Sequence, residues 1–368
     1  MKIGIITFCT PKQANYGQIL QCFALQSFLK KLGHKPFLIR YKVTRDNTED
    51  QNNKKSPLRF LFHFPTYIKL FEQIIKSHKF NDEERKHNRN FQDFIDKHIS
   101  SSSIFYDSLS LYDTPPIADA FICGSDQIWG GDTAYYLDFV SKGKTKIAYA
   151  PSFGGINSFS SAYEKKISLL LKDFSFIGMR ETSGVETCRR LGRSDTIQVA
   201  DPTLLLSKSD YDSIRINSNI NDNYLFLYLI GNPTDVKLSE VYKLAKRKGL
   251  RVIYVAAQMQ YDKREKTYPQ IGEWIDYIAR SQFVITNSYH GTIFSLIYNK
   301  PFITIPLVDE YKRMNTRIEE LLRNCKLENR ILQTSLSHYV ETLIDFTPFN
   351  EYKKNCSLFA KNLFQNLL

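Results

Sequence analysis

His290 lies where an apolar, strand-like run gives way to a helix. Residues 283–286 form the strand-like run, the polar residues 287–291 follow it, and residues 293–297 are apolar and helical in pattern. The start of a helix presents free backbone N–H groups and the positive end of the helix dipole. It therefore attracts phosphate or carboxylate and disfavours a charged imidazole. We expect a neutral His290 in the empty site, which becomes a proton donor when a dianionic substrate binds.

Short polar clusters also follow apolar runs elsewhere in the chain. The carboxyl ends of parallel strands share one edge of a sheet, and open α/β sheets bind their ligands at that edge. The clusters therefore predict an acceptor-binding or cleft-lining surface. Its expected members are Asn15, Tyr16, Gly17, Gly124, Ser125, Asp126, Gln127, Trp129, Ser152 and Asp201.

Several of these residues fit a structural role as well. The run from Asn15 to Gly17 is consistent with a turn and a helix start, and residues 124–126 with a plain helix cap. Trp129 is suited to the core or to stacking on a sugar ring. Arg180 ends an apolar strand, where its cation needs either an acidic neighbour or an anionic substrate.

The alternation of strand-like and helical segments predicts an α/β protein with two Rossmann-like domains facing each other across a cleft. A chain of 368 residues is long for a single core. We expect the first domain at 1–206, with a helical insertion at about 44–113. A linker rich in Ser, Asn and Asp is expected at 207–223, and the second domain at 224–348. A final amphipathic helix, 349–368, is expected to pack back towards the first domain.

The charge of the chain suits an anionic partner. A formal net charge of +12 fits nucleic acid, anionic lipid or a phosphorylated metabolite, and it also fits a simple solvated basic surface. We find no basic helix and no RNA-binding motif, so nucleic acid is not an expected partner. The aromatic and basic stretch 58–75 fits a helix–helix contact or a surface for a lipid-linked acceptor. Any membrane contact is expected to be peripheral, because no run approaches the ~20 apolar residues of a membrane span.

Cysteine usage and missing motifs narrow the compartment and the chemistry. The six cysteines are scattered, with no CxxC pair and no zinc-ligand spacing, and the first residues resemble a strand rather than a signal peptide. These features predict a cytoplasmic protein, with the inner face of the membrane as one location. The chain has no GxxxxGK[ST], GxGxxG after the first strand, HExxH or GxSxG motif and no acidic cluster, so neither a metal nor a cofactor is expected.

Six stretches, by their order and spacing, make the sequence similar to the polysaccharide pyruvyl transferase family. The similarity covers most of the chain outside 44–113. The stretches are NYGQILQ (15–21), FICGSDQIW (121–129), YAPSFG (149–154), GMRETSG (178–184), VADPTLLL (199–206) and TNSYHGTIFSLIYNKPFI (286–303).

This resemblance implies two facing Rossmann-like domains, similar to the GT-B arrangement. It also implies transfer of a pyruvyl group from phosphoenolpyruvate to two hydroxyls of one sugar, which forms a cyclic ketal. The sugar would belong to a surface polysaccharide or its lipid-linked precursor. Phosphoenolpyruvate would be the donor substrate rather than a cofactor, and a saccharide, free or lipid-linked, the acceptor. By the resemblance, His290 is the general acid/base, Arg180 contacts the donor's phosphate or carboxylate, and residues 124–126 line the cleft.

The last stretch departs from the family pattern at one position. Many family members carry Arg-Leu-His-Gly there, whereas this chain has Ser288 where the arginine stands. We expect another cation nearby to replace that charge. The expected donor-binding residues are Ser288, Tyr289, Gly291, Thr292, Lys312, Arg313 and Arg317.

Two other functions fit the same sequence. One is a GT-B-like glycosyltransferase that uses a nucleotide sugar, which fold-level analogy does not separate from a pyruvyl transferase. The other is a noncatalytic protein that binds a glycan or a membrane surface through its basic face. Binding of phosphoenolpyruvate, of a nucleotide sugar or of neither donor distinguishes the three.

Overall fold

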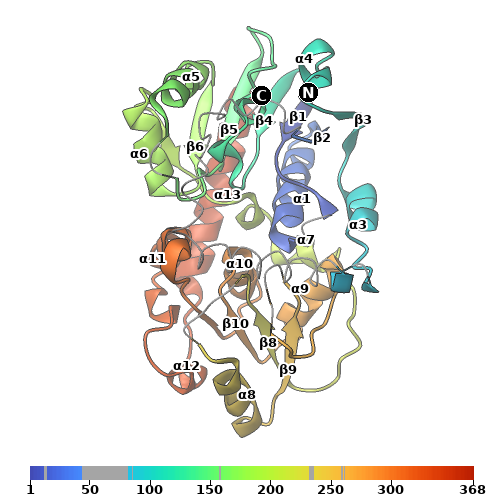
Figure 1. Cartoon of the computed structure of the whole chain (residues 1–368), viewed down its shortest axis with the longest axis vertical. Helices are drawn as coiled ribbons and strands as arrows, with labels where there is room; N and C mark the ends of the chain where they lie inside the picture. The colour runs from blue at the N-terminus through green and yellow to red at the C-terminus, as the bar shows by residue number, and fades with distance from the viewer. Residues whose placement is uncertain are drawn as a thin grey trace, which may run out of the picture.

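The chain folds into two parallel sheets stacked end to end, each flanked by helices (Figure 1). The computed structural model describes residues 1–11, 15–43, 82–84, 86–156, 159–231, 236–257, 260 and 262–368, apart from the side chains of residues 309 and 310. The predicted α/β class with parallel sheets is confirmed. The aromatic stretch 58–75 and most of the predicted insertion lie outside the described residues.

The first sheet has the strand order β3-β2-β1-β4-β5-β6-β7, and all of its pairings are parallel. Its central strands are short and buried, as expected for a sheet covered on both faces. The chain adds strands in one direction from β1 to β3 and in the opposite direction from β4 onwards. Such sheets bind ligands at the point where this direction changes, here between β1 and β4. The strands are β1 (Lys2–Ile6), β2 (Lys35–Tyr41), β3 (Ser101–Tyr106), β4 (Ala120–Cys123), β5 (Thr145–Tyr149), β6 (Phe176–Met179) and β7 (Ile197–Gln198).

Strand β3 corrects the predicted boundary of the helical insertion. Residues 101–106 belong to the 44–113 segment, yet they form the edge strand of the first sheet. The sequence hides this strand because it begins with three serines and leaves Ile104 and Phe105 exposed, so it lacks a buried apolar run. Helices do occur in the segment, at α3 (Phe91–His98) and α4 (Ser110–Asp113).

The second sheet has the strand order β11-β10-β8-β9 and is also parallel throughout. Its strands are β8 (Tyr224–Tyr228), β9 (Arg251–Val255), β10 (Phe283–Thr286) and β11 (Phe302–Thr304). The helices that accompany it are α8 (Leu238–Arg247), α9 (Ile271–Arg280), α10 (Tyr289–Ile297), α11 (Thr316–Asn324) and α12 (Leu336–Glu341).

The remaining helices surround the first sheet or connect the two halves. Helix α1 follows β1, and Asn15 caps it by accepting a hydrogen bond from the Gln18 amide. The segment expected as a linker, 207–223, starts with a short helix, because Ser207 and Asp210 form a capping box there. These helices are α1 (Tyr16–Lys31), α5 (Ser161–Leu171), α6 (Thr182–Arg190), α7 (Lys208–Asp212) and α13 (Thr347–Leu367).

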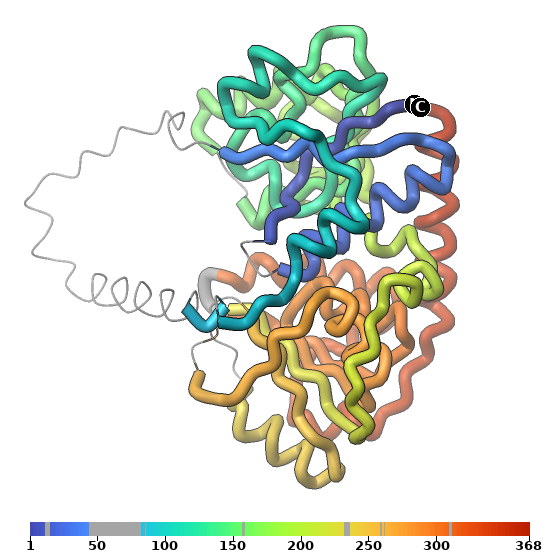
Figure 2. Tube along the Cα trace, turned by 90° about the vertical axis from the view of Figure 1, so that its right-hand side faces the viewer, coloured from blue at the N-terminus to red at the C-terminus, as the bar shows by residue number. Residues whose placement is uncertain are grey.

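Helix α13 runs alongside both halves of the molecule (Figure 2). Phe364, near its end, is fully buried, and its ring packs on Tyr149 of β5 at 5.2 Å and on Phe28 of α1 at 6.2 Å. The hydroxyl of Ser357 also donates to the Leu205 carbonyl. No helix among the described residues has both the length and the apolar character needed to cross a membrane.

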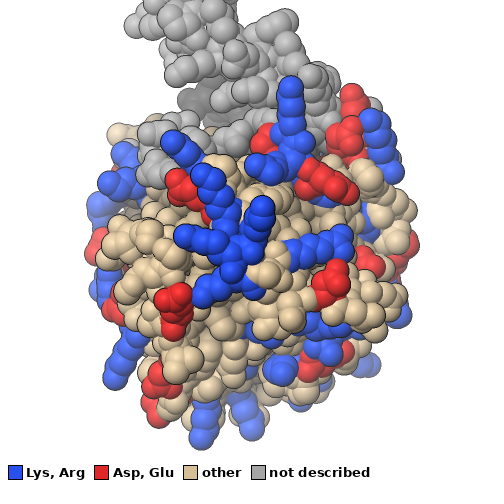
Figure 3. Space-filling model, turned by 90° about the horizontal axis from the view of Figure 1, so that it is seen from below, with Lys and Arg blue, Asp and Glu red and all other residues tan. Residues whose placement is uncertain are grey.

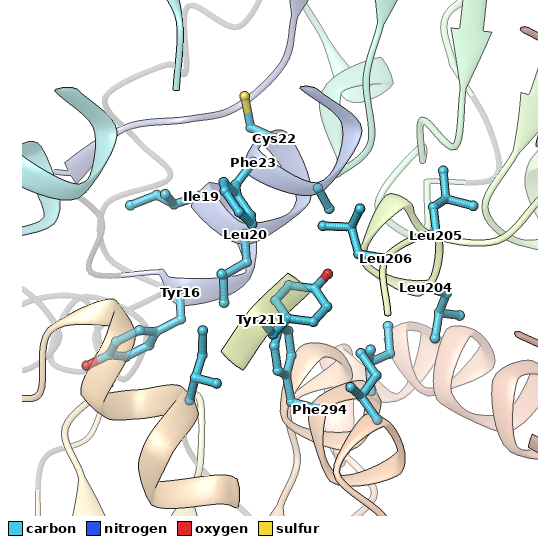
Figure 4. Packing of buried hydrophobic residues seen from close by; sticks show 14 of the residues in the cluster. Tyr16, Ile19, Leu20, Cys22, Phe23, Leu204, Leu205, Leu206, Tyr211 and Phe294 are labelled. Carbon is cyan, nitrogen blue, oxygen red and sulfur yellow. The ribbon is translucent and has the colours of Figure 1, made fainter. Parts of the chain in front are cut away.

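One hydrophobic core continues from the first sheet into the second. Residues of α1, the segment after β7 and α10 interdigitate at the junction (Figure 4). Tyr211 of α7 meets Phe294 of α10 edge to face, with ring centroids 4.8 Å apart. Tyr16 of α1 stacks on Trp274 of α9 at 5.0 Å. This apolar contact fixes α1 and α10 against each other, and both begin beside the candidate site.

Candidate functional site

Three polar side chains meet beyond the ends of β4, β6 and β7. The Ser125 hydroxyl donates to Asp201 Oδ2 at 2.8 Å. Arg180 Nη1 lies 3.3 Å from the Ser125 hydroxyl and 3.4 Å from the same carboxylate oxygen. All three residues are buried. Residues far apart in sequence therefore form one cluster, because the parallel strands end at the same edge.

Asp201 stays ionised although it has no exposed surface. Burial on its own would raise the pKa of this carboxyl, but the neighbouring His290 and Arg180 outweigh burial and hold the pKa well below its usual range. Its other oxygen, Oδ1, accepts hydrogen bonds from the backbone and side chain of Thr203. Asp201 is thus a fixed negative charge at the centre of the cluster.

Arg180 is surrounded by carboxylates but leaves donors unused. Burial opposes its charge, yet Glu181, Asp126 and Asp201 raise the pKa of the guanidinium above its ordinary value. Glu181 and Asp126 lie at 3.7 and 3.9 Å, too far for good hydrogen bonds. Its Nε and Nη2 atoms are buried and have no hydrogen-bond partner. Buried donors of this kind are rarely left unpaired, so these two atoms are candidates to bind an acceptor on a ligand.

His290 reaches this cluster from the second sheet. It lies in the first turn of α10, and its Nε2 atom is 3.6 Å from Asp201 Oδ2. That Nε2 atom is buried and has no hydrogen-bond partner. The imidazole and the carboxylate therefore face each other across a gap that a substrate atom or a small movement would close. This pairing joins the two halves of the molecule at one point.

Gly17 makes room for the histidine. A Cβ atom added at this position would lie 2.0 Å from His290 Nδ1, far inside van der Waals contact. Gly17 is the second residue of α1 and does not have a positive φ, so its backbone conformation does not require glycine. Glycine is therefore required at this position because the imidazole of His290 approaches the backbone so closely. Of the run 15–17, this residue contacts the site directly.

The ring of Tyr289 contacts two guanidiniums. Its ring centroid is 5.2 Å from Arg180 Cζ and 5.8 Å from Arg317 Cζ. Arg317 belongs to α11, and burial together with Arg180 lowers the pKa of its guanidinium. With the side-chain amide of Gln127 assigned so that its oxygen faces α11, that oxygen accepts from both Arg317 Nη atoms at 3.2 and 3.3 Å.

Of the three cations expected to replace the family's arginine, Arg317 is the one that contacts Tyr289 beside the cluster. Among the described side chains, no carboxylate comes within 4.0 Å of it, and Glu181 and Asp126 act on its charge only from farther away. Arg313 lies farther out, where its Cβ approaches Gly155 across the junction. Lys312 is exposed.

The other predicted donor-binding residues hold α10 in place. Ser288 caps the helix: its hydroxyl accepts from the Gly291 amide at 3.2 Å. The Thr292 hydroxyl contacts the Ser288 carbonyl and the Thr304 hydroxyl. Gly291 is needed because a Cβ there would lie 2.5 Å from Thr286 Oγ1. These groups bond within the second half of the molecule, and contact of Ser288, Gly291 and Thr292 with the donor stays a prediction.

Two residues predicted to line the cleft are core residues instead. Trp129 has no exposed surface, stacks on Tyr136 at 4.8 Å and donates its indole N–H to the Tyr135 carbonyl. It cannot offer a face to a sugar. Tyr16 is equally buried, and its hydroxyl donates to the Pro269 carbonyl and accepts from Arg89. An aromatic residue beside a polar cluster looks the same in sequence whether it faces the site or the core.

The remaining predicted residues shape the loops around the cluster. Asp126 adopts φ 88°, and its carboxylate accepts from the Gln127 amide at 2.8 Å. The Ser152 hydroxyl accepts from the Gly154 amide. Gly124 packs against Thr7, where a Cβ would lie 3.0 Å away. Asn15 caps α1, as described above.

Glu320 was not among the residues predicted from the sequence. This carboxylate of α11 accepts the Thr182 amide at the start of α6 and the side-chain amide of Gln198. It thereby caps a helix of the first half from the second half. Its pattern in sequence is that of an ordinary helical glutamate, so no local signal reveals it. Within the described residues, no group of three or more His, Cys, Asp or Glu side chains could hold a metal ion.

Comparisons with known proteins place the fold and the family. A family model described as polysaccharide pyruvyl transferase matches residues 15–307. A search of curated proteins found no match. Among solved structures, a UDP-N-acetylglucosamine 2-epimerase from Rickettsia bellii is similar at a TM-score of 0.56 and 11% identity, covering 99% of this chain and 95% of that one.

A UDP-GlcNAc 2-epimerase from Methanocaldococcus jannaschii, solved with UDP-GlcNAc and UDP, gives a TM-score of 0.51 at 13% identity and covers 99% of this chain and 100% of that one. Identities this low show the fold alone, and they confirm the expected GT-B-like arrangement. The family match spans most of the chain and includes all six stretches of the sequence analysis. The chain belongs to the polysaccharide pyruvyl transferase family.

Proposed function

We propose that the chain transfers a pyruvyl group from phosphoenolpyruvate to two hydroxyls of one sugar, forming a cyclic ketal and releasing phosphate. Family membership supports the reaction class. The observation that carries the proposal is that His290 faces Asp201 at 3.6 Å while the guanidiniums of Arg180 and Arg317 both contact the ring of the neighbouring Tyr289. A donor with both a carboxylate and a phosphate requires cations and an acid in this combination.

The two arginines are suited to different parts of the donor. Arg180 keeps two buried donors unused but is already neutralised by acidic neighbours, which suits it to the smaller carboxylate charge. Arg317 has no carboxylate within 4.0 Å among the described side chains, which suits it to the phosphate. The start of α10 adds the positive end of its dipole. Charge-assisted hydrogen bonds from guanidinium to oxyanions are among the strongest a protein makes.

His290 acts as the acid and then as the base. It first donates a proton to the methylene carbon of phosphoenolpyruvate, which leaves the central carbon electron-poor. A sugar hydroxyl adds to that carbon and returns a proton to the imidazole. Phosphate then leaves, the second hydroxyl adds at the same carbon, and its proton passes to the released phosphate as the ketal closes. The reaction consists of proton transfer, addition and elimination, so as proposed it uses no cofactor.

Asp201 supports both steps of the histidine. Its carboxylate faces Nε2 at 3.6 Å and stabilises the imidazole whenever that ring carries a positive charge. Ser125 and Thr203 hold the carboxylate in place, so it does not turn away when the substrate binds. General acid–base catalysis by one such group is worth about 10²–10⁴-fold in rate.

Donor binding and phosphate release test the proposal. Phosphoenolpyruvate should raise the melting temperature of the protein, and phosphate should be released from it when a suitable galactoside or mannoside is added. A rise in melting temperature with UDP-sugars alone would replace the proposal with a glycosyltransferase. Stabilisation by neither donor would favour a noncatalytic glycan-binding protein.

A further inference from the structure

The second half of the molecule carries a basic face around α8 and β9. Residues 236–268 contain nine Lys and Arg against three Asp and Glu, a formal charge of +6 out of +12 for the whole chain. Seen from below, Lys and Arg side chains gather on this end of the molecule, where α8 lies (Figure 3). Half of the net charge therefore sits in less than a tenth of the chain.

Helix α8 concentrates this charge on its outer side. Val241, Leu244 and Ala245 are buried against the second sheet. Lys243, Lys246 and Arg247 are exposed. The sequence-based expectation that the chain has no basic helix is thus wrong, because the basic residues of α8 alternate with apolar ones and do not form an unbroken run.

Few acidic residues balance the face. Lys248 pairs with Glu341 at 3.0 Å, and Arg251 with Asp222 at 3.4 Å. Such exposed pairs are weak and easily exchanged. Lys243, Lys246 and Arg247 have no carboxylate within 4.0 Å among the described side chains. Their charge is open to an external partner.

An apolar side chain projects beside this face. Leu343 is 96% exposed, more than any other large hydrophobic residue that the structure describes. It follows closely after Glu341, the residue that pairs with Lys248 of the basic face. Glu341 and Asp345 are the acidic groups on either side of it. Transfer of this side chain from water into an apolar environment would be favourable.

A buried arginine fixes the turn that presents Leu343. Arg330 is 1% exposed and donates to the carbonyls of Tyr339 at 3.1 Å, Thr342 at 3.0 Å and Leu343 at 3.5 Å. Among the described side chains it has no carboxylate partner. Burying a cation costs free energy, and here that cation serves to hold three backbone carbonyls of one surface turn.

We propose that this face docks on a bilayer containing anionic phospholipids. Lys243, Lys246 and Arg247 contact the headgroups, and Leu343 inserts among the acyl chains at the interface. Polybasic clusters beside an exposed apolar side chain bind anionic bilayers. The face is rich in lysine, which is depleted at protein–protein interfaces, so a bilayer fits it better than a protein partner. This inference does not depend on which donor the active site uses.

Vesicle co-sedimentation tests the docking face. The full chain should sediment with vesicles containing about a third phosphatidylglycerol and stay in solution with pure phosphatidylcholine, and added salt should weaken the binding. Each basic residue near an anionic surface raises the partition coefficient roughly fivefold. The combined change Lys243→Gln, Lys246→Gln and Arg247→Gln should therefore lower the partition coefficient roughly 100-fold. Leu343→Ser should lower it about tenfold.

Matched variants on the other half separate this face from charge in general. Lys142→Gln, Lys144→Gln and Lys165→Gln remove the same charge from exposed positions of the first half, and Ile117→Ser changes an 84% exposed apolar residue there. Both controls should bind vesicles like the parent chain. Equal losses in the controls would overturn the proposal. Retained vesicle binding in Leu343→Ser, together with equal affinity for RNA, would also overturn it and indicate a general polyanion surface.

Discussion

Where the strands of the first sheet end, polar side chains bind one another; where α10 begins in the second sheet, they mostly bind their own backbone. Ser125, Arg180 and Asp201 form a charged cluster across three strand ends. Ser288 and Thr292 are used to start α10. The first region is thus a preformed charge environment, and the second presents one imidazole to it. Clustered polar residues have different roles depending on whether strands or a helix cap bring them together.

Removing the imidazole is the strongest test of this difference. His290→Ala should reduce turnover by 10²–10⁴-fold, because the general acid and base is lost, while the fold persists. Turnover measured as phosphate release gives the effect, and circular dichroism with a melting curve checks the fold. Near-parental turnover in a folded His290→Ala chain would remove the histidine from the mechanism.

The contact between the two regions is broken by a single methyl group. Gly17→Ala places Cβ 2.0 Å from His290 Nδ1, so the imidazole must move. Displacing a reacting group by about 1 Å costs about 100-fold in rate. Ser27→Ala, on the same helix, should change nothing. A Gly17→Ala chain that is both more stable and fully active would show that only helix propensity, worth about 1 kcal/mol, is at work there.

The second guanidinium distinguishes the site from its surroundings. Arg317→Gln removes a cation that has no close ion pair among the described side chains, and the KM for the donor should rise about 10–100-fold with a smaller change in kcat. Lys312→Gln, which removes an exposed charge a few residues away, should leave the KM within about twofold. Equal effects of the two variants would mean that overall charge, and not a contact at the site, holds the donor.

The smallest effect is expected at the helix cap. Ser288→Ala should lower the free energy of unfolding by about 1 kcal/mol, since the cap on the Gly291 amide is lost. Turnover measured well below the melting temperature should change little. A large loss of turnover without a loss of stability would show that Ser288 contacts the substrate after all.

Much of this arrangement follows from the sequence. The α/β class, the GT-B-like fold and the family could be predicted, because apolar strands, helix caps and the order of six stretches are local signals. The edge strand β3 was not predictable, since an exposed serine-rich strand resembles a loop. Trp129 was placed wrongly, because its depth depends on Tyr136 and other distant partners.

The contacts of His290 with Asp201 and Gly17 across the junction could not be predicted from the sequence for the same reason. The sequence marks His290, Asp201 and Gly17 individually, but which of them touch depends on how two sheets pack. From the sequence, Lys312, Arg313 and Arg317 were equal candidates to replace the family's arginine. The structure distinguishes them, because Arg317 lies in α11 while Lys312 lies in the turn before that helix. Contacts between elements far apart in sequence carry no local signature.

The hydrogen bond from the Thr182 amide to Glu320 makes separation of the two halves measurable. The Thr182 amide lies at the first position of α6, where no carbonyl of its own helix can accept it. Its acceptor is a carboxylate from the other half of the molecule. Whenever the two halves separate, that one proton becomes free to exchange with solvent. Hydrogen exchange at Thr182 therefore measures how often the molecule opens, and a bound donor should slow it.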